Sequence, residues 1–247
     1  MPVMLYDDKA PDILKKYVVK AFPTFIITDA EGAEVMRQVG APFQTPKDAI
    51  KWFGDVADGL ENLPKYEAAY EKDPENIDAA MKLAEAYAAL GKADKALPLY
   101  EKLAEKVKPD DKRWVDIQLK YADGLLATMT QENQKDVGGK IAKVYDAVLP
   151  GLVSAKDERA LEPSILNARI KSFLNEDHEG ARKELKALVE AFPKHERLKE
   201  IKYWAAAIAQ KSGDNETAKA EYEALVKEGP EDDRYVKAAK SAIARMK

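Results

Sequence analysis

The side chains that could carry chemistry in this sequence are few and scattered. Its two histidines, His178 in NEDHEG and His195 in FPKHE, both lie in polar stretches typical of turns. No spacing joins them to further ligands, as a zinc site would require. The acidic clusters NEDHEG and GPEDD lack the alternating oxygen ligands and the glycine of a calcium-binding loop. We therefore predict no metal site and interpret both histidines as solvated turn residues.

Nucleophilic chemistry has no better support. The sequence contains no cysteine, so it offers no disulfide, no thiolate nucleophile and no thiolate metal ligand. No serine, histidine and acidic residue suggest a triad, and the glycines of GLENLP and DVGGK do not follow a phosphate-loop pattern. Trp52, Trp114 and Trp204 are more typical of packing between helices than of a ligand cage. We predict no catalytic residue and no cofactor.

The overall composition narrows the choice of partners. The chain has 247 residues, of which 46% are hydrophobic, which is enough for a sizeable core. Lys and Arg number 40 against 44 Asp and Glu, and the net charge of -4 argues against a nucleic-acid partner. No apolar run approaches the roughly 20 residues that cross a bilayer, and the N-terminus lacks the features of a signal peptide. We therefore expect a cytoplasmic protein, as given, with no membrane partner.

The elements that must position any site change in character near Leu60. Before it, the short β-rich runs PVMLY, TFIIT and AEVMRQV alternate with turn signals such as DDKAPD and DAEG. After it, Ala, Leu, Lys and Glu dominate, and apolar residues recur at helical spacing. We predict two domains, an α+β part at residues 1–60 and an all-α part at residues 61–247.

Two distant stretches of the helical part share one register. Five positions align at identical offsets, with small residues and a final tyrosine in both stretches. They are Ala84, Tyr87, Gly91, Ala96 and Tyr100 in the first, and Ala206, Ala209, Gly213, Ala218 and Tyr222 in the second. The pattern resembles the tetratricopeptide repeat, a helical hairpin of about 34 residues. This resemblance implies that small residues let two helices approach while an aromatic residue fills the gap between pairs.

The resemblance covers most of residues 77–230 and includes weaker copies. In a third copy, Ala181 takes the second small position and Leu185 replaces the aromatic residue. Residues 111–150 suit another pair of helices, joined by the long link QENQKDVGGK with its two glycines. ENLPKYEAAYEKDP is typical of a lone second helix before the array, and RYVKAAKSAIARMK of a capping helix after it. The expected architecture is a predominantly helical, right-handed solenoid, although other helical-hairpin repeats share the same physics.

Tetratricopeptide repeats bind peptides or proteins on their concave face. Residue by residue, the resemblance assigns this face to Met81, Glu85 and Ala88 in the first repeat, Leu166, Ile170 and Phe173 in the third, and Tyr203, Ala207 and Gln210 in the fourth. The face is mainly apolar and neutral. Members that clamp a C-terminal carboxylate have lysine and asparagine at the positions of Met81 and Glu85, so this sequence departs from that subtype. Alternatively, neighbouring helices fill part of this face.

The N-terminal part resembles the C-terminal half of a thioredoxin domain. FPT, around Pro23, matches that family's proline signature, and a strand, a hairpin turn and an edge strand follow it through residue 40. A closing helix is expected at residues 45–59, with Thr45 as its cap and with Ile50, Phe53 and Val56 on its inner face. PVMLY would supply a third strand. The resemblance also implies a cis peptide bond before Pro23.

The family's Cys-x-x-Cys half is missing from this sequence. In the family, its strand lies between those that match PVMLY and TFIIT, so these two strands lack their common neighbour here. They would pair directly, accept a strand from a second copy as a homodimer, or stay loose. Alternatively, the true protein starts upstream and carries the cysteines there.

Two functions follow from these patterns. We favour a non-enzymatic scaffold in which a solenoid binds a protein or peptide and a redox-inactive thioredoxin-like remnant is attached to it. The alternative is a truncated thiol-disulfide oxidoreductase whose Cys-x-x-Cys half lies upstream of this chain. No activity is expected for the chain as given, because exchange requires a thiol.

Overall fold

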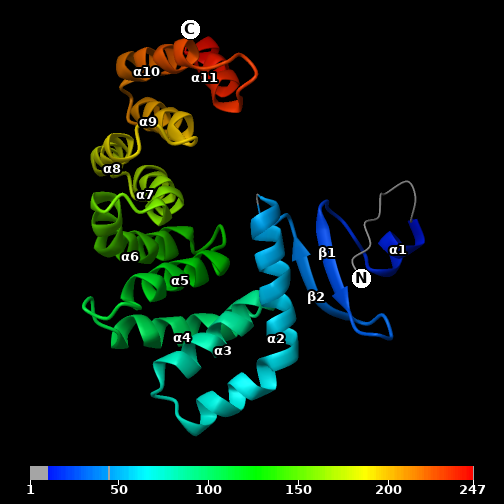
Figure 1. The fold of residues 1–247 in the computed structure, drawn as a ribbon. Coiled ribbons are helices and arrows are strands. Elements are labelled where there is room, and N and C mark those ends of the chain that lie inside the picture. The colour runs from blue at the N-terminus through cyan, green and yellow to red at the C-terminus, as the bar shows by residue number, and fades with distance from the viewer. Residues whose placement is uncertain (1–10, 44, 247) are drawn as a thin grey trace. The chain divides into compact units, whose positions relative to one another are not determined.

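The computed structural model describes residues 11–43 and 45–246, which are predominantly helical (Figure 1). The chain forms two compact units, Met1–Glu105 and Lys106–Lys247. The elements of the first are α1 (Pro11–Lys16), β1 (Thr24–Thr28), β2 (Glu34–Val39), α2 (Pro46–Lys72), α3 (Ile77–Ala89) and α4 (Ala93–Lys106). Those of the second are α5 (Trp114–Ala127), α6 (Gln134–Ser154), the 3-10 turn η1 (Glu158–Ala160), α7 (Leu161–Phe173), α8 (His178–Ala191), α9 (Leu198–Lys211), α10 (Asn215–Glu228) and α11 (Arg234–Arg245).

The strands β1 and β2 form an antiparallel hairpin, as the sequence pattern indicates. Thr24 lies opposite Val39, and a bulge follows Ile27. In the connecting turn, the Asp29 carboxylate accepts hydrogen bonds from two backbone N–H groups. Such side-chain acceptors are the reason that aspartate favours turns. The peptide bond before Pro23 is cis, as the resemblance implies.

The described residues contain two of the three strands that the resemblance to thioredoxin implies. The third, expected at PVMLY, lies outside the described residues. A two-stranded hairpin packed on a helix is a common arrangement. By itself it does not identify a thioredoxin-like remnant.

One face of the hairpin packs on the first turns of α2. Met36 and Val56 are buried in the same cluster. Aromatic rings extend this core, because the ring centroid of Phe25 lies 5.6 Å from that of Trp52 and 6.1 Å from that of Phe53. The apolar residues of TFIIT thus fix the helix that follows them.

The inner face expected on this helix was only partly right. Val56 is buried, but Ile50 is 76% exposed, and Phe53 is 41% exposed although its ring contacts Phe25. The reason is geometric. At 3.6 residues per turn, positions 50 and 56 lie about 120° apart around the helix axis, so one flat surface does not cover both.

Helix α2 begins as expected but ends much later. The Thr45 hydroxyl accepts a hydrogen bond from the backbone N–H of Asp48, whose carboxylate accepts one from the backbone N–H of Thr45, forming a capping box. The helix then runs through Pro64 for 27 residues. The sequence predicted separate helices on either side of Leu60, but Leu60 lies inside α2. Packing of α2 along α3 offsets the local cost of the internal proline.

The helices α3 and α4 form the first hairpin in the predicted register. The aligned positions Ala84, Tyr87, Ala96 and Tyr100 are all buried. Gly91 turns the chain between the helices with a φ of +69°, a left-handed conformation that glycine adopts at little cost. The hydroxyl of Tyr87 donates a hydrogen bond to Glu67 of α2 at 2.6 Å, which raises the pKa of the tyrosine to about 12.

The helices α9 and α10 repeat this arrangement in the second unit. Their aligned positions Ala206, Ala209, Ala218 and Tyr222 are all buried, and Gly213 has a φ of +88°. The helix α11 packs on this pair through Val236, Ala239 and Ala242. A last helix that shields the apolar face of an array is what the sequence predicted for this segment.

The third hairpin, α7 and α8, has one additional residue in its connection. Three residues separate the helices in α3–α4 and in α9–α10, whereas residues 174–177 separate α7 from α8. Ala181 and Leu185 are buried in α8, as expected. In α7 the small buried residue is Ala168, one position before the one that identical offsets indicate. Every position transferred to α7 by fixed offsets is therefore shifted by one.

The two glycines of the expected long link lie inside α6. This helix begins at Gln134, before both of them. A Cβ atom at Gly138 would lie 2.9 Å from Cδ1 of Leu174 and 3.3 Å from Cγ2 of Ile170. Gly138 therefore permits a close approach of α6 to the end of α7, and this packing offsets the low helix propensity of glycine.

A similar turn precedes each of α3, α5, α7, α9 and α11. One side chain accepts a hydrogen bond from the backbone N–H two residues later. The pairs are Asp73–Glu75, Asp111–Arg113, Asp157–Arg159, His195–Arg197 and Asp233–Tyr235. The acceptors recur every 38 residues, except for 46 between the second and the third. These turns set where the first helix of each hairpin begins.

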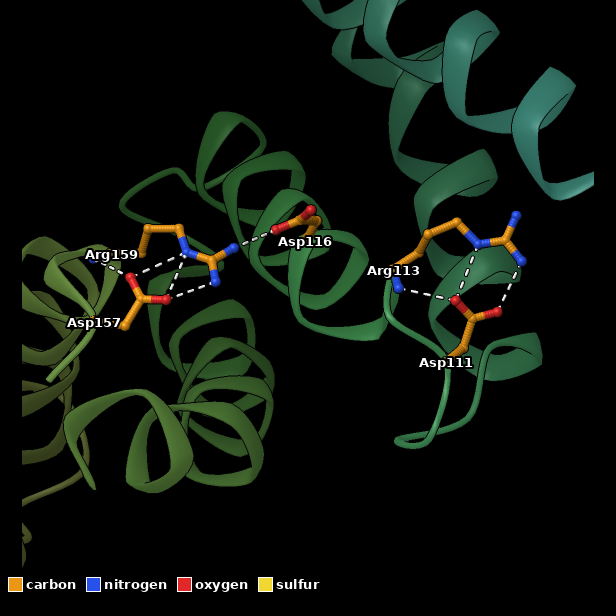
Figure 2. Close-up of polar contacts among 5 residues, drawn as sticks. All are labelled: Asp111, Arg113, Asp116, Asp157 and Arg159. Atoms are coloured by element: carbon orange, nitrogen blue, oxygen red, sulfur yellow. Dashed lines mark hydrogen bonds and ion pairs between the residues drawn. The ribbon is translucent and has the colours of Figure 1, made fainter. Parts of the chain in front are cut away.

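Two of these turns also contain an ion pair within the turn (Figure 2). The guanidinium of Arg113 donates to Asp111, which lowers the pKa of that carboxyl to about 2. Arg159 pairs in the same way with Asp157, and its second branch reaches Asp116 of α5 at 2.6 Å. Arg159 thus links the turn before α7 to the preceding hairpin.

Candidate partner-binding surface

The positions transferred to the first repeat lie together on α3. Met81 is half-buried, while Glu85 and Ala88 are exposed. Their spacing of four and three residues places them on one side of the helix. In the first unit, α3 therefore presents a small surface with one apolar, one acidic and one short side chain.

In the second unit, a row of aromatic rings crosses α7, α9 and α11. We call it the aromatic surface, and it consists of Phe173, Trp204, Tyr203 and Tyr235, with Arg169 beside them. The ring centroids lie 6.3 Å apart from Phe173 to Trp204, 5.5 Å from Trp204 to Tyr203, and 5.6 Å from Tyr203 to Tyr235. The first two pairs are edge-to-face, a preferred geometry for aromatic pairs. Phe173 is 42% exposed and the other three rings are half-buried.

Arg169 adds a cation to this surface. Its guanidinium carbon lies 4.3 Å from the ring centroid of Trp204. Such stacking orients the guanidinium plane and leaves its N–H donors at the edge. Among the described residues, no carboxylate forms an ion pair with Arg169. The donors are therefore available to water or to a ligand.

The sequence analysis missed Arg169 because of the additional residue after α7. Arg169 follows the small residue Ala168 in the same way that Glu85 follows Ala84. Counting from the small residue in α7 itself, rather than from Ala181 in α8, would have identified it. The small residue Ala168 marks this register in the sequence, but the length of the turn between α7 and α8 could not be read from it.

Two predicted positions on α9 are used partly for internal packing. The ring of Tyr203 lies 5.7 Å from that of Tyr222, which is buried in α10. The side-chain oxygen of Gln210 accepts a hydrogen bond from the hydroxyl of Tyr222 at 3.3 Å. Burial raises the pKa of Tyr222 to about 12. Ala207 is half-buried between them. Neighbouring helices thus fill part of this face, the alternative that the sequence left open.

On α7, the predicted positions differ in accessibility. Phe173 is exposed and Leu166 is half-buried, but Ile170 is only 3% exposed. Ile170 lies against Gly138 of α6, so its side chain belongs to the core of the second unit. The assignment of Ile170 to an accessible face is corrected accordingly. The cause is the close approach of α6, which Gly138 permits at this point of α7.

A partly buried polar network links α7 to α6 and α8. The Asn167 side-chain amide donates to Asp146 of α6 at 2.9 Å and to Glu184 of α8 at 3.0 Å. Lys171 pairs with the same two carboxylates at 2.6 and 3.2 Å. Burial raises the pKa of Glu184, and the nearby ammonium of Lys171 opposes that shift. Three helices share these contacts, which fix the position of α7 between α6 and α8.

The histidines take part in local hydrogen bonds. His178 shares a hydrogen bond of 2.8 Å with the Ser172 hydroxyl, and the His195 ring accepts one from the backbone N–H of Arg197. Within residues 11–43 and 45–246, no three His, Asp or Glu side chains gather closely enough to hold a metal ion. None of the described helices has the length and apolar character needed to span a membrane.

Comparisons with known proteins agree with the helical part of this description. Residues 57–121 match the model of the tetratricopeptide repeat. No curated protein sequence matches this chain. The TPR-like repeats of a protein from Podosopora anserina, described as a putative kinesin light chain, are similar in structure with a TM-score of 0.53 and 17% identity, over 74% of this chain and 95% of that one. A single-residue variant of the same repeats gives a TM-score of 0.54 and 17% identity over 80% and 92%.

At this level of identity the likeness concerns the fold alone. The class of protein defined by the hairpins, their buried small residues and these matches is that of predominantly helical, tetratricopeptide-like repeats. Repeat proteins of this class generally bind other proteins.

Proposed function

We propose that this protein is a non-enzymatic scaffold that binds a peptide or protein segment on the aromatic surface of α7, α9 and α11. The observation that supports this proposal most directly is the row of accessible rings flanked by Arg169. Aromatic residues and arginine are the side chains that contribute most at protein interfaces. No cofactor takes part.

The chemistry of the surface favours a polypeptide as the ligand. Partly exposed rings offer apolar surface together with the hydroxyl groups of the tyrosines. This combination suits a peptide that has both apolar and polar side chains. In the first unit, the exposed positions Glu85 and Ala88 with half-buried Met81 on α3 are proposed as a separate contact surface. The near balance of Lys and Arg with Asp and Glu in the sequence does not favour nucleic acid.

Selection of peptides from a random phage-displayed library tests this function. Selected peptides are expected to bind the wild-type protein and to lose at least about tenfold in affinity when Phe173→Ser and Arg169→Ala are combined. Both side chains are exposed, so the fold is retained, which circular dichroism checks. Lys186→Ala, an exposed change on α8, is the matched control. If the selected peptides bind the Phe173→Ser and Arg169→Ala double variant as tightly as the Lys186→Ala control, the aromatic surface is excluded as the site.

The first 60 residues are assigned to a thioredoxin-like remnant and residues 61–247 to the repeat array, with α2 shared by both. The order of helix, strand, turn, strand and long helix supports this assignment. The sequence has no cysteine to carry exchange, so the remnant is expected to be redox-inactive. An insulin-reduction assay is expected to give only background activity.

The outer strand edges offer a place for pairing with a second copy, and a concentration series in analytical ultracentrifugation tests for such a homodimer.

A further inference from the structure

At its centre, the strand β1 is apolar on both of its faces. Its central residues Phe25, Ile26 and Ile27 form an uninterrupted apolar run. Such a run is typical of strands that are covered on both sides, whereas a strand with one solvent-exposed face alternates apolar and polar residues. The helix α2 covers the face that carries Phe25, Ile27 and Met36. The other face carries Ile26 between Thr24 and Thr28.

Among the described residues, the segment that follows α1 partly covers that second face, on the side of the sheet away from α2 (Figure 1). A hollow of about 670 Å³ opens there, with Val18, Ala21, Thr24 and Val39 among its lining residues. Val18 is 62% exposed and Val39 is 55% exposed. We call these four residues with their basic neighbours, described next, the open sheet face.

Basic side chains surround this apolar floor. Lys16, Lys20 and Arg37 line the hollow. Arg37 is neutralised by Glu34 and also donates to the backbone carbonyl of Tyr17. Neither Lys16 nor Lys20 pairs with a carboxylate within the part of the chain that the structure describes. Among residues 11–43 and 45–246, the rim therefore has two positive charges that form no ion pair.

The rim is held in place by the fold. The Tyr17 hydroxyl donates to the backbone carbonyl of Gly32 at 2.9 Å, which ties the end of α1 to the hairpin turn. The Lys16 ammonium lies 4.9 Å from the centroid of the Tyr17 ring. Gly32 has a φ of +80° in this turn. The floor and its rim are therefore presented together, without a large rearrangement.

We infer that the open sheet face binds an acidic amphipathic helix of a partner protein. The apolar side of such a helix would cover Val18 and Val39, and its carboxylates would meet Lys16 and Lys20. A helix is about 10 Å across, close to the width of two strands, so one helix covers this sheet. The product is a helix–sheet–helix sandwich, the layer arrangement that buries a sheet which is apolar on both faces.

A designed peptide supplies the probe. An 18-residue, fluorescein-labelled peptide with leucines on one side of the helix and glutamates on the other is expected to bind the full chain, more weakly at high salt because the contact is partly ionic. The same peptide with lysine in place of glutamate is expected to bind at least about tenfold more weakly. Equal binding of both peptides, or no binding of either, would overturn the proposal.

Matched variants locate the binding. The double variant Lys16→Glu with Lys20→Glu is expected to lower the affinity for the acidic peptide by about tenfold or more. Val39→Ser is expected to lower it by a smaller factor. Lys227→Glu with Lys237→Glu, two exposed lysines of α10 and α11, changes the net charge equally and is expected to have less than about a twofold effect. A loss that is equal in both double variants would show an effect of net charge alone and would contradict the proposal.

Two further measurements distinguish the open sheet face from the aromatic surface and from a contact between two copies of the chain. The combined change of Phe173→Ser and Arg169→Ala is expected to leave the affinity of the acidic peptide unchanged. If it abolishes binding, the peptide occupies the aromatic surface and the open sheet face is not its site. If ultracentrifugation shows a dimer that Val39→Ser dissociates, a second copy covers this face, and the inference of an acidic partner helix is wrong.

Discussion

At the scale of single residues, the neighbouring glycines of α6 form a natural comparison. A Cβ at Gly138 would meet Leu174 and Ile170, whereas one at Gly139 would meet nothing within 4 Å. We expect Gly139→Ala to stabilise the chain by up to about 1 kcal/mol, because alanine favours helix. Gly138→Ala has the same helix gain but must displace the Leu174 side chain and press on Ile170, so we expect it to be less stable than Gly139→Ala by about 1 kcal/mol. Urea denaturation of both variants measures the difference.

Equal stability of the two alanine variants would contradict the close approach at Gly138. It would mean that the side chain of Leu174 moves aside without cost. The comparison is informative because the two changes have the same chemistry and differ only in their neighbours.

The carboxyl group of Asp111 leads to a prediction about how the stability of the fold depends on pH. Its folded pKa is lowered to about 2 from an ordinary 3.8, first by its hydrogen bonds with the Arg113 side chain. A depressed folded pKa contributes stability above the unfolded pKa, and this contribution is lost as pH falls through the folded value. We expect Asp111→Asn to be less stable than wild type at pH 6, and the difference to shrink between about pH 4 and pH 2. Denaturation at a series of pH values checks this, and a constant difference would show that the charge is not involved.

At the scale of elements, α11 is expected to stabilise the pair α9 and α10. It covers a cluster that includes Tyr222 and Leu225. Deleting residues 234–247 would expose that apolar surface, so we expect the melting temperature to fall by about 5 °C or more and the binding of an apolar dye to rise. Lys237→Ala, an exposed change on α11, should shift stability by less than about 0.5 kcal/mol and serves as the control. An unchanged melting temperature after the deletion would contradict the capping role of α11.

At the scale of the whole molecule, the chain should divide where its contacts are sparse. The boundary between the two compact units falls after Glu105, whereas the change in sequence character lies near Leu60. The apolar clusters around Leu185 and Tyr222 lie wholly within the second unit. We therefore expect a fragment of residues 106–247 to be helical and to melt cooperatively. Circular dichroism checks this, and a largely unfolded fragment would show that the second unit depends on the first.

The sequence determined the features that depend on neighbours along the chain. Helical spacing, the left-handed turn at Gly91 and the small residues Ala84 and Ala206 are fixed by local geometry and by the close approach of paired helices. The cap at Thr45 belongs to the same class, because the residues of a capping box lie within one turn. Each of these was predictable, since its partners lie only a few residues away.

Tertiary structure alone decided the features whose partners are distant or whose spacing depends on loop length. The continuity of α2 through Leu60 reflects its packing on α3, and the helical state of Gly138 reflects its packing on α7. Ile170 is buried against α6, and Arg169 of α7 lies over Trp204 of α9. Burial free energy depends on which surfaces meet in space. A register carried across a turn of unknown length can be wrong by one residue, which is about 100° around the helix axis.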